Sequence, residues 1–169
     1  MATTYEAIAT VEVGSGGAAD IEFTSIPATY TDLLVKVSAR STDGSWQGMY
    51  MRLNGATTNY SSIYLDGTGS SVGSGVITST GLYVSTIGGT NATSSTFTNS
   101  EIYIPNYTSS NNKSLSADGS AENNAIAAYL NLIANLWSDS AAITSILLYS
   151  AAGNIAEYST ATLYGIKNS

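Results

Sequence analysis

The chain has 169 residues, of which 43% are hydrophobic and only 10% are charged, against about 25% charged residues in an average soluble domain. It contains 5 basic and 12 acidic residues, a net charge of −7, and neither His nor Cys. These two absences exclude Ser-His-Asp and Cys-His catalytic sites, disulfides, zinc fingers and iron–sulfur clusters. The length predicts one domain, 1–169, which can bury roughly 70% of the unfolded surface.

The positive charges are too scattered for a nucleic-acid surface, which needs clustered cations. They are Lys36, Arg40, Arg52, Lys113 and Lys167. Residues 1–6 contain neither a basic nor an apolar region, so we expect no export signal. No stretch approaches the roughly 18 apolar residues of a membrane-spanning helix, and we therefore expect no membrane partner.

In the first third of the chain, short alternating runs are separated by turn residues, a pattern typical of strands. Residues 5–13 and 19–23 alternate in this way, and Pro27 follows the second run. The clearest strand is predicted at 33–40, because its two positive charges fall on one face, which we expect to meet water.

The middle of the chain continues the strand pattern with more polar loop between the runs. A Gly- and Ser-rich stretch at 67–75 predicts a long flexible loop, and a second polar loop is expected at 88–95. The strands expected in this part are 49–53, 60–65, 76–84 and 96–104.

The last third contains one ambiguous segment, 125–137. Its large apolar residues recur at spacings of three and four, as on one side of a helix, but they also alternate from Leu130 to Leu136, as on one face of a strand. We favour the strand because the neighbouring segments have strand patterns. Those segments are 113–117, 142–149 and 161–166.

Together these runs predict an all-β protein with eight to ten antiparallel strands and no regular helical pattern. Short strands bounded by turn residues at this spacing are typical of a jelly-roll-like β-sandwich. No repeat of fixed period and no linker divides the chain, so we expect a single β-sandwich domain.

The acidic residues are the remaining source of catalytic or metal chemistry. Glycoside hydrolysis needs two carboxyl groups that face each other across a bond, and no such pair stands out, so we expect no enzymatic activity and no catalytic residues. Asp43, Asp66 and Asp118 each precede a glycine, and we interpret each Asp-Gly pair as a β-turn. We expect no cofactor and no metal site. Calcium is the one ion that these acids can bind, provided that their loops converge.

Aromatic residues are the remaining candidates for contacts. Tyr103, Tyr149 and Tyr164 fall in expected strands, as their β-propensity favours. Trp46 instead lies in a turn-rich segment. A rigid amphipathic ring there can pack at a protein interface or stack on a sugar, so Trp46 is the candidate surface-contact residue.

Six short segments of the chain carry a resemblance to a known family. They are IPATYTDLLV at 26–35, RLNG at 52–55, NYS at 59–61, IPNY at 104–107, AITSI at 142–146 and LYGIK at 163–167. Together they resemble small virion structural proteins of tailed bacteriophages, marine phages in particular, over the chain from Tyr5 to Lys167. The resemblance implies a jelly-roll-like domain mounted on the outer surface of the virion after assembly in the host cytoplasm, and it brings no catalytic residues.

The resemblance leaves two places on the particle open. We favour a capsid decoration (cement) protein that bridges capsomers, because the chain has room for one compact domain and its Ser/Thr/Asn-rich surface suits an inert coat. Such proteins commonly occupy local threefold positions, so we expect a homotrimer bound to the major capsid protein. The alternative is a tail fibre or tail appendage protein, or a receptor-binding (carbohydrate-binding) module attached to tail proteins, with contact groups around Trp46, 66–75 and 88–95.

Overall fold

The computed structural model describes residues 4–122, 124 and 128–167. These residues form twelve strands, and none of them lies in a helix long and apolar enough to cross a membrane. The strands are β1 (Tyr5–Glu12), β2 (Asp20–Phe23), β3 (Asp32–Ala39), β4 (Gln47–Leu53), β5 (Tyr60–Gly67), β6 (Val72–Ile77), β7 (Leu82–Ile87), β8 (Thr98–Ile104), β9 (Lys113–Ala121), β10 (Tyr129–Trp137), β11 (Ile146–Ser150) and β12 (Thr160–Ile166).

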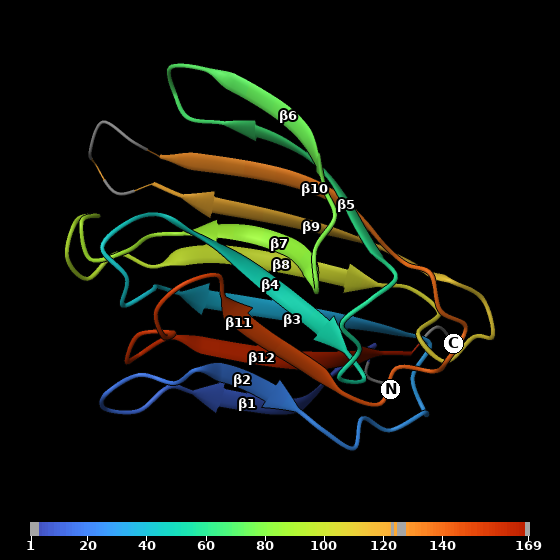
Figure 1. Ribbon diagram of the computed structural model, residues 1–169. Helices are drawn as coiled ribbons and strands as arrows, with labels where there is room; N and C mark the ends of the chain where they lie inside the picture. Colours follow the sequence, from blue (N-terminus) through green and yellow to red (C-terminus); the bar gives the residue numbers. More distant parts are fainter. Residues whose placement is uncertain (1–3, 123, 125–127, 168–169) are drawn as a thin grey trace.

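The strands form two facing antiparallel sheets (Figure 1). The larger has the order β1-β12-β3-β8-β9-β10-β5-β6, and the smaller has the order β2-β11-β4-β7. Alternate residues of the strands that face each other point between the sheets, where Leu33, Met51 and Ile102 are fully buried. The apolar core therefore lies between the two sheets, as expected for a sandwich.

Eight of the strands form a jelly roll. When β5, β6, β9 and β10 are set aside, the first strand pairs with the last and the second with the next to last, and the nesting continues inward as β1·β12, β2·β11, β3·β8 and β4·β7. This nested pairing wraps one folded ribbon of strands around a single core, which is the jelly-roll arrangement. The expected jelly-roll-like sandwich is confirmed, with twelve strands in place of eight to ten.

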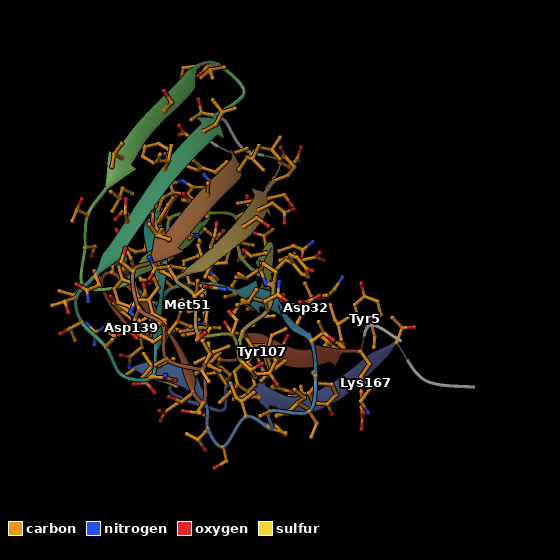
Figure 2. The ribbon with its side chains drawn as sticks, turned by 90° about the vertical axis from the view of Figure 1, so that its right-hand side faces the viewer. Tyr5, Asp32, Met51, Tyr107, Asp139 and Lys167 are labelled. Carbon is orange, nitrogen blue, oxygen red and sulfur yellow. The ribbon has the colours of Figure 1, made fainter. Side chains whose placement is uncertain are left out.

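The four further strands extend the larger sheet. The β5–β6 hairpin is inserted between β4 and β7, the β9–β10 hairpin is inserted between β8 and β11, and β10 pairs with β5 to join them. Figure 2 shows these strands rising away from the rest of the molecule, at the opposite end from Tyr5 and Lys167. We call β9, β10, β5 and β6 the extension.

Two of the three predicted Asp-Gly turns are wrong. Asp66 lies within β5 and Asp118 lies within β9, whereas Asp43 lies in a loop as predicted. In β9 the glycine permits close packing, since a Cβ added at Gly119 would lie 2.3 Å from the Oγ of Ser85 on β7. A glycine in a strand can thus mark a close approach and not a turn.

The predicted flexible loop at 67–75 is also wrong. The chain reverses over 68–71, where the Thr68 N–H donates to the Ser71 carbonyl at 2.9 Å, and β6 follows at once. The ambiguous segment at 125–137 contains strand β10, as favoured, and its residues 125–127 lie outside the described residues.

Candidate functional site

Strand β10 presents three leucines to solvent, while Ile133 and Trp137 on its other face are buried. Leu130 and Leu132 are 67% and 62% exposed, whereas Asn131 and Asn135 point between the sheets and are 5% and 3% exposed. A shift of register by one residue would exchange these two sets. The paired registers with β5 and β9 hold the leucines outside.

The inward asparagines have a structural role at the free edge of the smaller sheet. Strand β7 is the last strand of that sheet, so N–H groups on its free side lack a ladder partner. The Thr86 N–H donates to Asn131 Oδ1 at 2.8 Å, and the Tyr83 N–H donates to the Ser62 Oγ at 3.1 Å, which in turn donates to Asn135. The outer leucines have no comparable role in the fold.

The outer side of β10, β5 and β6 forms one continuous apolar surface, which we call the apolar face. The strand registers place Leu132 opposite Leu65, and Val76 opposite Ile63. Its seven large side chains, each 38–79% exposed, are Ile63, Leu65, Val72, Val76, Leu130, Leu132 and Leu136. Contiguous apolar surface of this kind marks interaction sites on soluble proteins.

The same side of the larger sheet becomes charged at β9. Asp118 stands directly opposite Leu132 on one side and Glu101 on the other. Glu101 in turn forms an exposed ion pair with Lys36 at 2.8 Å. Partial burial and the neighbouring Glu101 raise the pKa of the Asp118 carboxyl. The charged region of the larger sheet thus begins at Asp118, next to the apolar face.

The inner side of the extension borders a cleft of about 310 Å³. The cleft lies where β5 and β6 project past the edge of the smaller sheet, between these strands, the start of β10, and β4 and β7. We call it the aromatic cleft because its walls include five aromatic side chains and one carboxylate. These residues are Trp46, Tyr50, Tyr64, Tyr83, Tyr129 and Asp66.

The aromatic rings form two groups. The Tyr83 ring lies between those of Tyr50 and Tyr64, with ring centroids 5.8 and 5.9 Å apart. Trp46 and Tyr129 form the second group, with centroids 5.0 Å apart at a tilt of 58°. Ring pairs at these separations stabilise one another, so the walls of the cleft hold their shape.

Two glycines of β6 keep the cleft open. Gly75 lies opposite Tyr64 and Gly73 opposite Asp66. A Cβ added at Gly75 would lie 2.9 Å from the Tyr64 hydroxyl oxygen, and one at Gly73 would lie 2.4 Å from Asp66 Oδ1. The ring and the carboxylate therefore lie across the hairpin, where any other residue in β6 would displace them.

Two buried polar atoms on β5 and β10 lack hydrogen-bond partners. Asp66 Oδ1 and Asn131 Nδ2 are both buried without a hydrogen bond. The two residues lie directly opposite each other on β5 and β10. An unpaired acceptor and an unpaired donor are thus held on adjacent strands.

Trp46, the candidate contact residue, lies at one end of the aromatic cleft and is partly exposed. Its loop is fixed by Asp43, whose Oδ1 accepts hydrogen bonds from the Ser45 N–H at 3.0 Å and from Gln47 Nε2 at 2.8 Å. Hydrogen bonds from Ser45 lower the pKa of the Asp43 carboxyl. The structure brings Trp46 and Asp66 to one site, although the sequence predicts them in two different loops.

The predicted loop at 88–95 lies on the other side of Trp46. Arg40 holds it, since its guanidinium donates to the carbonyls of Ala92, Thr93 and Thr96 at 2.7–3.1 Å. Tyr103, Tyr149 and Tyr164 lie in β8, β11 and β12, as predicted. Tyr50, Tyr64, Tyr83 and Tyr129 were not predicted as site residues, because alternation alone does not reveal which strand faces remain uncovered.

The three acids considered for calcium do not converge. Asp66 points to the inner side of the extension, Asp118 to the outer side, and Asp43 is engaged by its own loop. Within the described part of the chain, no group of three or more acidic residues is placed to hold a metal ion.

Comparison of the chain with protein-family models, with curated protein sequences and with solved structures gives no significant match.

Proposed function

We propose that this chain is a non-enzymatic structural protein of a phage virion, a capsid decoration protein that assembles as a homo-oligomer through its apolar face. The observation that carries the proposal is the exposure of Leu130, Leu132 and Leu136 on a strand whose inward face holds asparagines. Burial of these leucines by another subunit removes apolar surface from water, worth about 25 cal/mol per Å².

The apolar face is the part of the surface through which a second copy of the chain can approach without charge repulsion. The chain carries a net charge of −7, so two copies repel through most of their surface. The seven large side chains of the apolar face carry no charge, and the outer side of β9 next to it holds Ser114, Ser116, Asp118 and Ser120. An apolar centre with a polar border is the usual build of a protein interface.

The face is large enough to form the centre of such an interface. Three neighbouring strands of six to nine residues cover roughly 15 by 25 Å in plan, given the spacing of strands and residues in a sheet. A standard interface takes about 800 Å² from each partner, a tenth of the 8050 Å² surface of the chain. The apolar face therefore matches the centre of an interface whose border includes β9.

The virion assignment rests on the sequence resemblance, and the jelly roll suits it because that fold is used in viral capsids. A trimer at local threefold positions of the capsid is the expected assembly. Decoration protein in this position bridges capsomers and holds them against the internal pressure of packaged DNA.

The oligomer is tested with the purified full chain by light scattering after gel filtration. We expect a homotrimer, and we expect Leu132→Asp to convert it to a monomer. Tyr158→Asp is the matched control, because Tyr158 is 66% exposed outside the apolar face and the change adds the same charge. A monomeric wild-type chain, or a Leu132→Asp variant that still assembles, contradicts the proposal.

Deletion of the gene from a phage that carries it separates head from tail. We expect particles that adsorb to cells but break more readily on heating, and immunogold labelling of the wild-type particle on the head. Sturdy particles that fail to adsorb, with label on the tail, support the tail appendage instead.

A further inference from the structure

We infer that the aromatic cleft is a binding site for a neutral saccharide. Sugar rings present flat faces of C–H groups, which pack on aromatic rings, and hydroxyl groups around their edges, which hydrogen-bond to polar side chains. The cleft offers both kinds of contact, since the rings of Tyr50, Tyr64 and Tyr83 line it together with the carboxylate of Asp66.

The charge of the cleft selects against anionic ligands. Asp66 is acidic, and no basic side chain occurs among the described residues that line the cleft. Phosphate, sulfate and carboxylate groups on a ligand would face this carboxylate without a compensating cation. Nucleotides and acidic glycans are therefore disfavoured, although their rings too can stack on aromatic side chains.

The Asp66 carboxylate supplies the polar contact of the cleft. Asp66 is one of the lining residues, and no described residue donates a hydrogen bond to its Oδ1. A carboxylate accepts hydrogen bonds and a sugar hydroxyl donates one, so Asp66 can hold a hydroxyl group at the edge of a sugar ring.

The cleft is preformed and of suitable size. Its volume of about 310 Å³ lies at the lower end of the roughly 300–1,000 Å³ of small-molecule sites, which is room for one or two sugar rings. Gly73 and Gly75 keep the floor open, and paired rings hold the walls. A preformed site avoids the free-energy cost of ordering side chains on binding.

This inference is independent of the proposed assembly. The apolar face lies on the outer side of the extension and the aromatic cleft on the inner side, because alternate residues of β5 point to opposite sides. Assembly through the apolar face leaves the cleft free. The monomeric variant Leu132→Asp should accordingly bind saccharide as the wild-type chain does.

The test is saturation-transfer NMR with titration calorimetry on the full chain. The neutral probes are mannotriose, maltotriose, cellotriose and chitotriose in its N-acetylated form, and the anionic probes are sialyllactose and AMP. We expect at least one neutral trisaccharide to bind, and Tyr64→Ala and Asp66→Asn to weaken that binding about three- to tenfold. Tyr5→Ala is the matched control, because Tyr5 is exposed on β1 at the other end of the larger sheet, and it should change nothing.

Circular dichroism verifies that each variant folds. If Tyr64→Ala does not fold, the result for Asp66→Asn alone decides the test. Three outcomes overturn the inference: no neutral probe binds at millimolar concentration, the anionic probes bind in preference, or binding survives both substitutions in the cleft unchanged.

Discussion

Leu132 on β10 and Asp118 on β9 stand directly opposite each other on the outer side of the larger sheet, and the border between its apolar and charged halves runs between them. Across this border the side chains change from leucine to carboxylate within one strand spacing. A subunit that covers the apolar face therefore reaches Asp118 at its edge.

Asp118→Asn is predicted to raise the free energy of unfolding at pH 7 by about 0.5 kcal/mol, since solvent screening keeps the effect of an exposed charge small. The Asp118 pKa is raised in the folded chain by partial burial and by Glu101. The folded state thus binds this proton more tightly, and stability is lost as the pH rises through the raised pKa. Urea unfolding at pH 3 and pH 7 measures the effect, which should vanish at pH 3; Asp20→Asn, at an exposed acid on β2, is the control.

Asn131→Ala is predicted to destabilise the chain by about 1–3 kcal/mol, because it leaves the buried Thr86 N–H without an acceptor. The exposed Asn99, on the outer side of β8, provides the control, and Asn99→Ala should stay within about 0.5 kcal/mol of the wild-type chain. Denaturant unfolding of both variants measures the difference. Equal effects of the two substitutions would mean that Asn131 does not cap the edge of β7.

Gly89→Ala is predicted to destabilise the chain by about 1–3 kcal/mol or more, as overpacking of a tight site does. A Cβ at Gly89 would lie 2.0 Å from the Ser45 carbonyl oxygen, which belongs to the backbone of the Trp46 loop. The tryptophan emission spectrum should shift as well, since Trp137 is buried elsewhere and Trp46 reports on its loop. Gly44→Ala, with no atom near its added Cβ, should leave melting temperature and emission nearly unchanged.

Alkaline unfolding is predicted between about pH 10, the ordinary tyrosine pKa, and pH 12. Burial raises the pKa of Tyr83 to about 12, and burial also raises the pKa of Tyr50 and Tyr60. These phenols keep their protons in the folded chain, so their contribution to stability is complete below pH 10 and is lost as the pH rises through the raised pKa values. Absorbance of tyrosinate near 295 nm should show a late phase that coincides with loss of circular dichroism. Tyr83→Phe should diminish this phase, and ionisation of all tyrosines near pH 10 without unfolding would contradict the prediction.

The sequence by itself determined the class of the fold. Alternation of apolar and polar residues is local, and it correctly placed strands around 33–40 and 96–104 and favoured a strand for 125–137. It also made Trp46 a candidate contact residue, because a large ring in a polar loop is conspicuous without any knowledge of its neighbours. A jelly-roll-like sandwich follows from such signals, since many short strands must pack as two sheets to bury their apolar faces.

Only the tertiary structure decided which face of each strand is covered. The leucines and asparagines of β10 alternate equally well in either orientation. The inward face is the one that buries Ile133 and Trp137 and lets Asn131 accept from the N–H of Thr86, 45 residues earlier in the sequence. Likewise the sequence alone suggests that Gly119 is a turn glycine. The structure shows that it allows β7 to pack closely against β9. The apolar face and the aromatic cleft arise from two inserted hairpins that pair with each other over a long sequence separation. Residue periodicity does not indicate such pairing, because it reflects the conformation of one strand and not the identity of its partner strands.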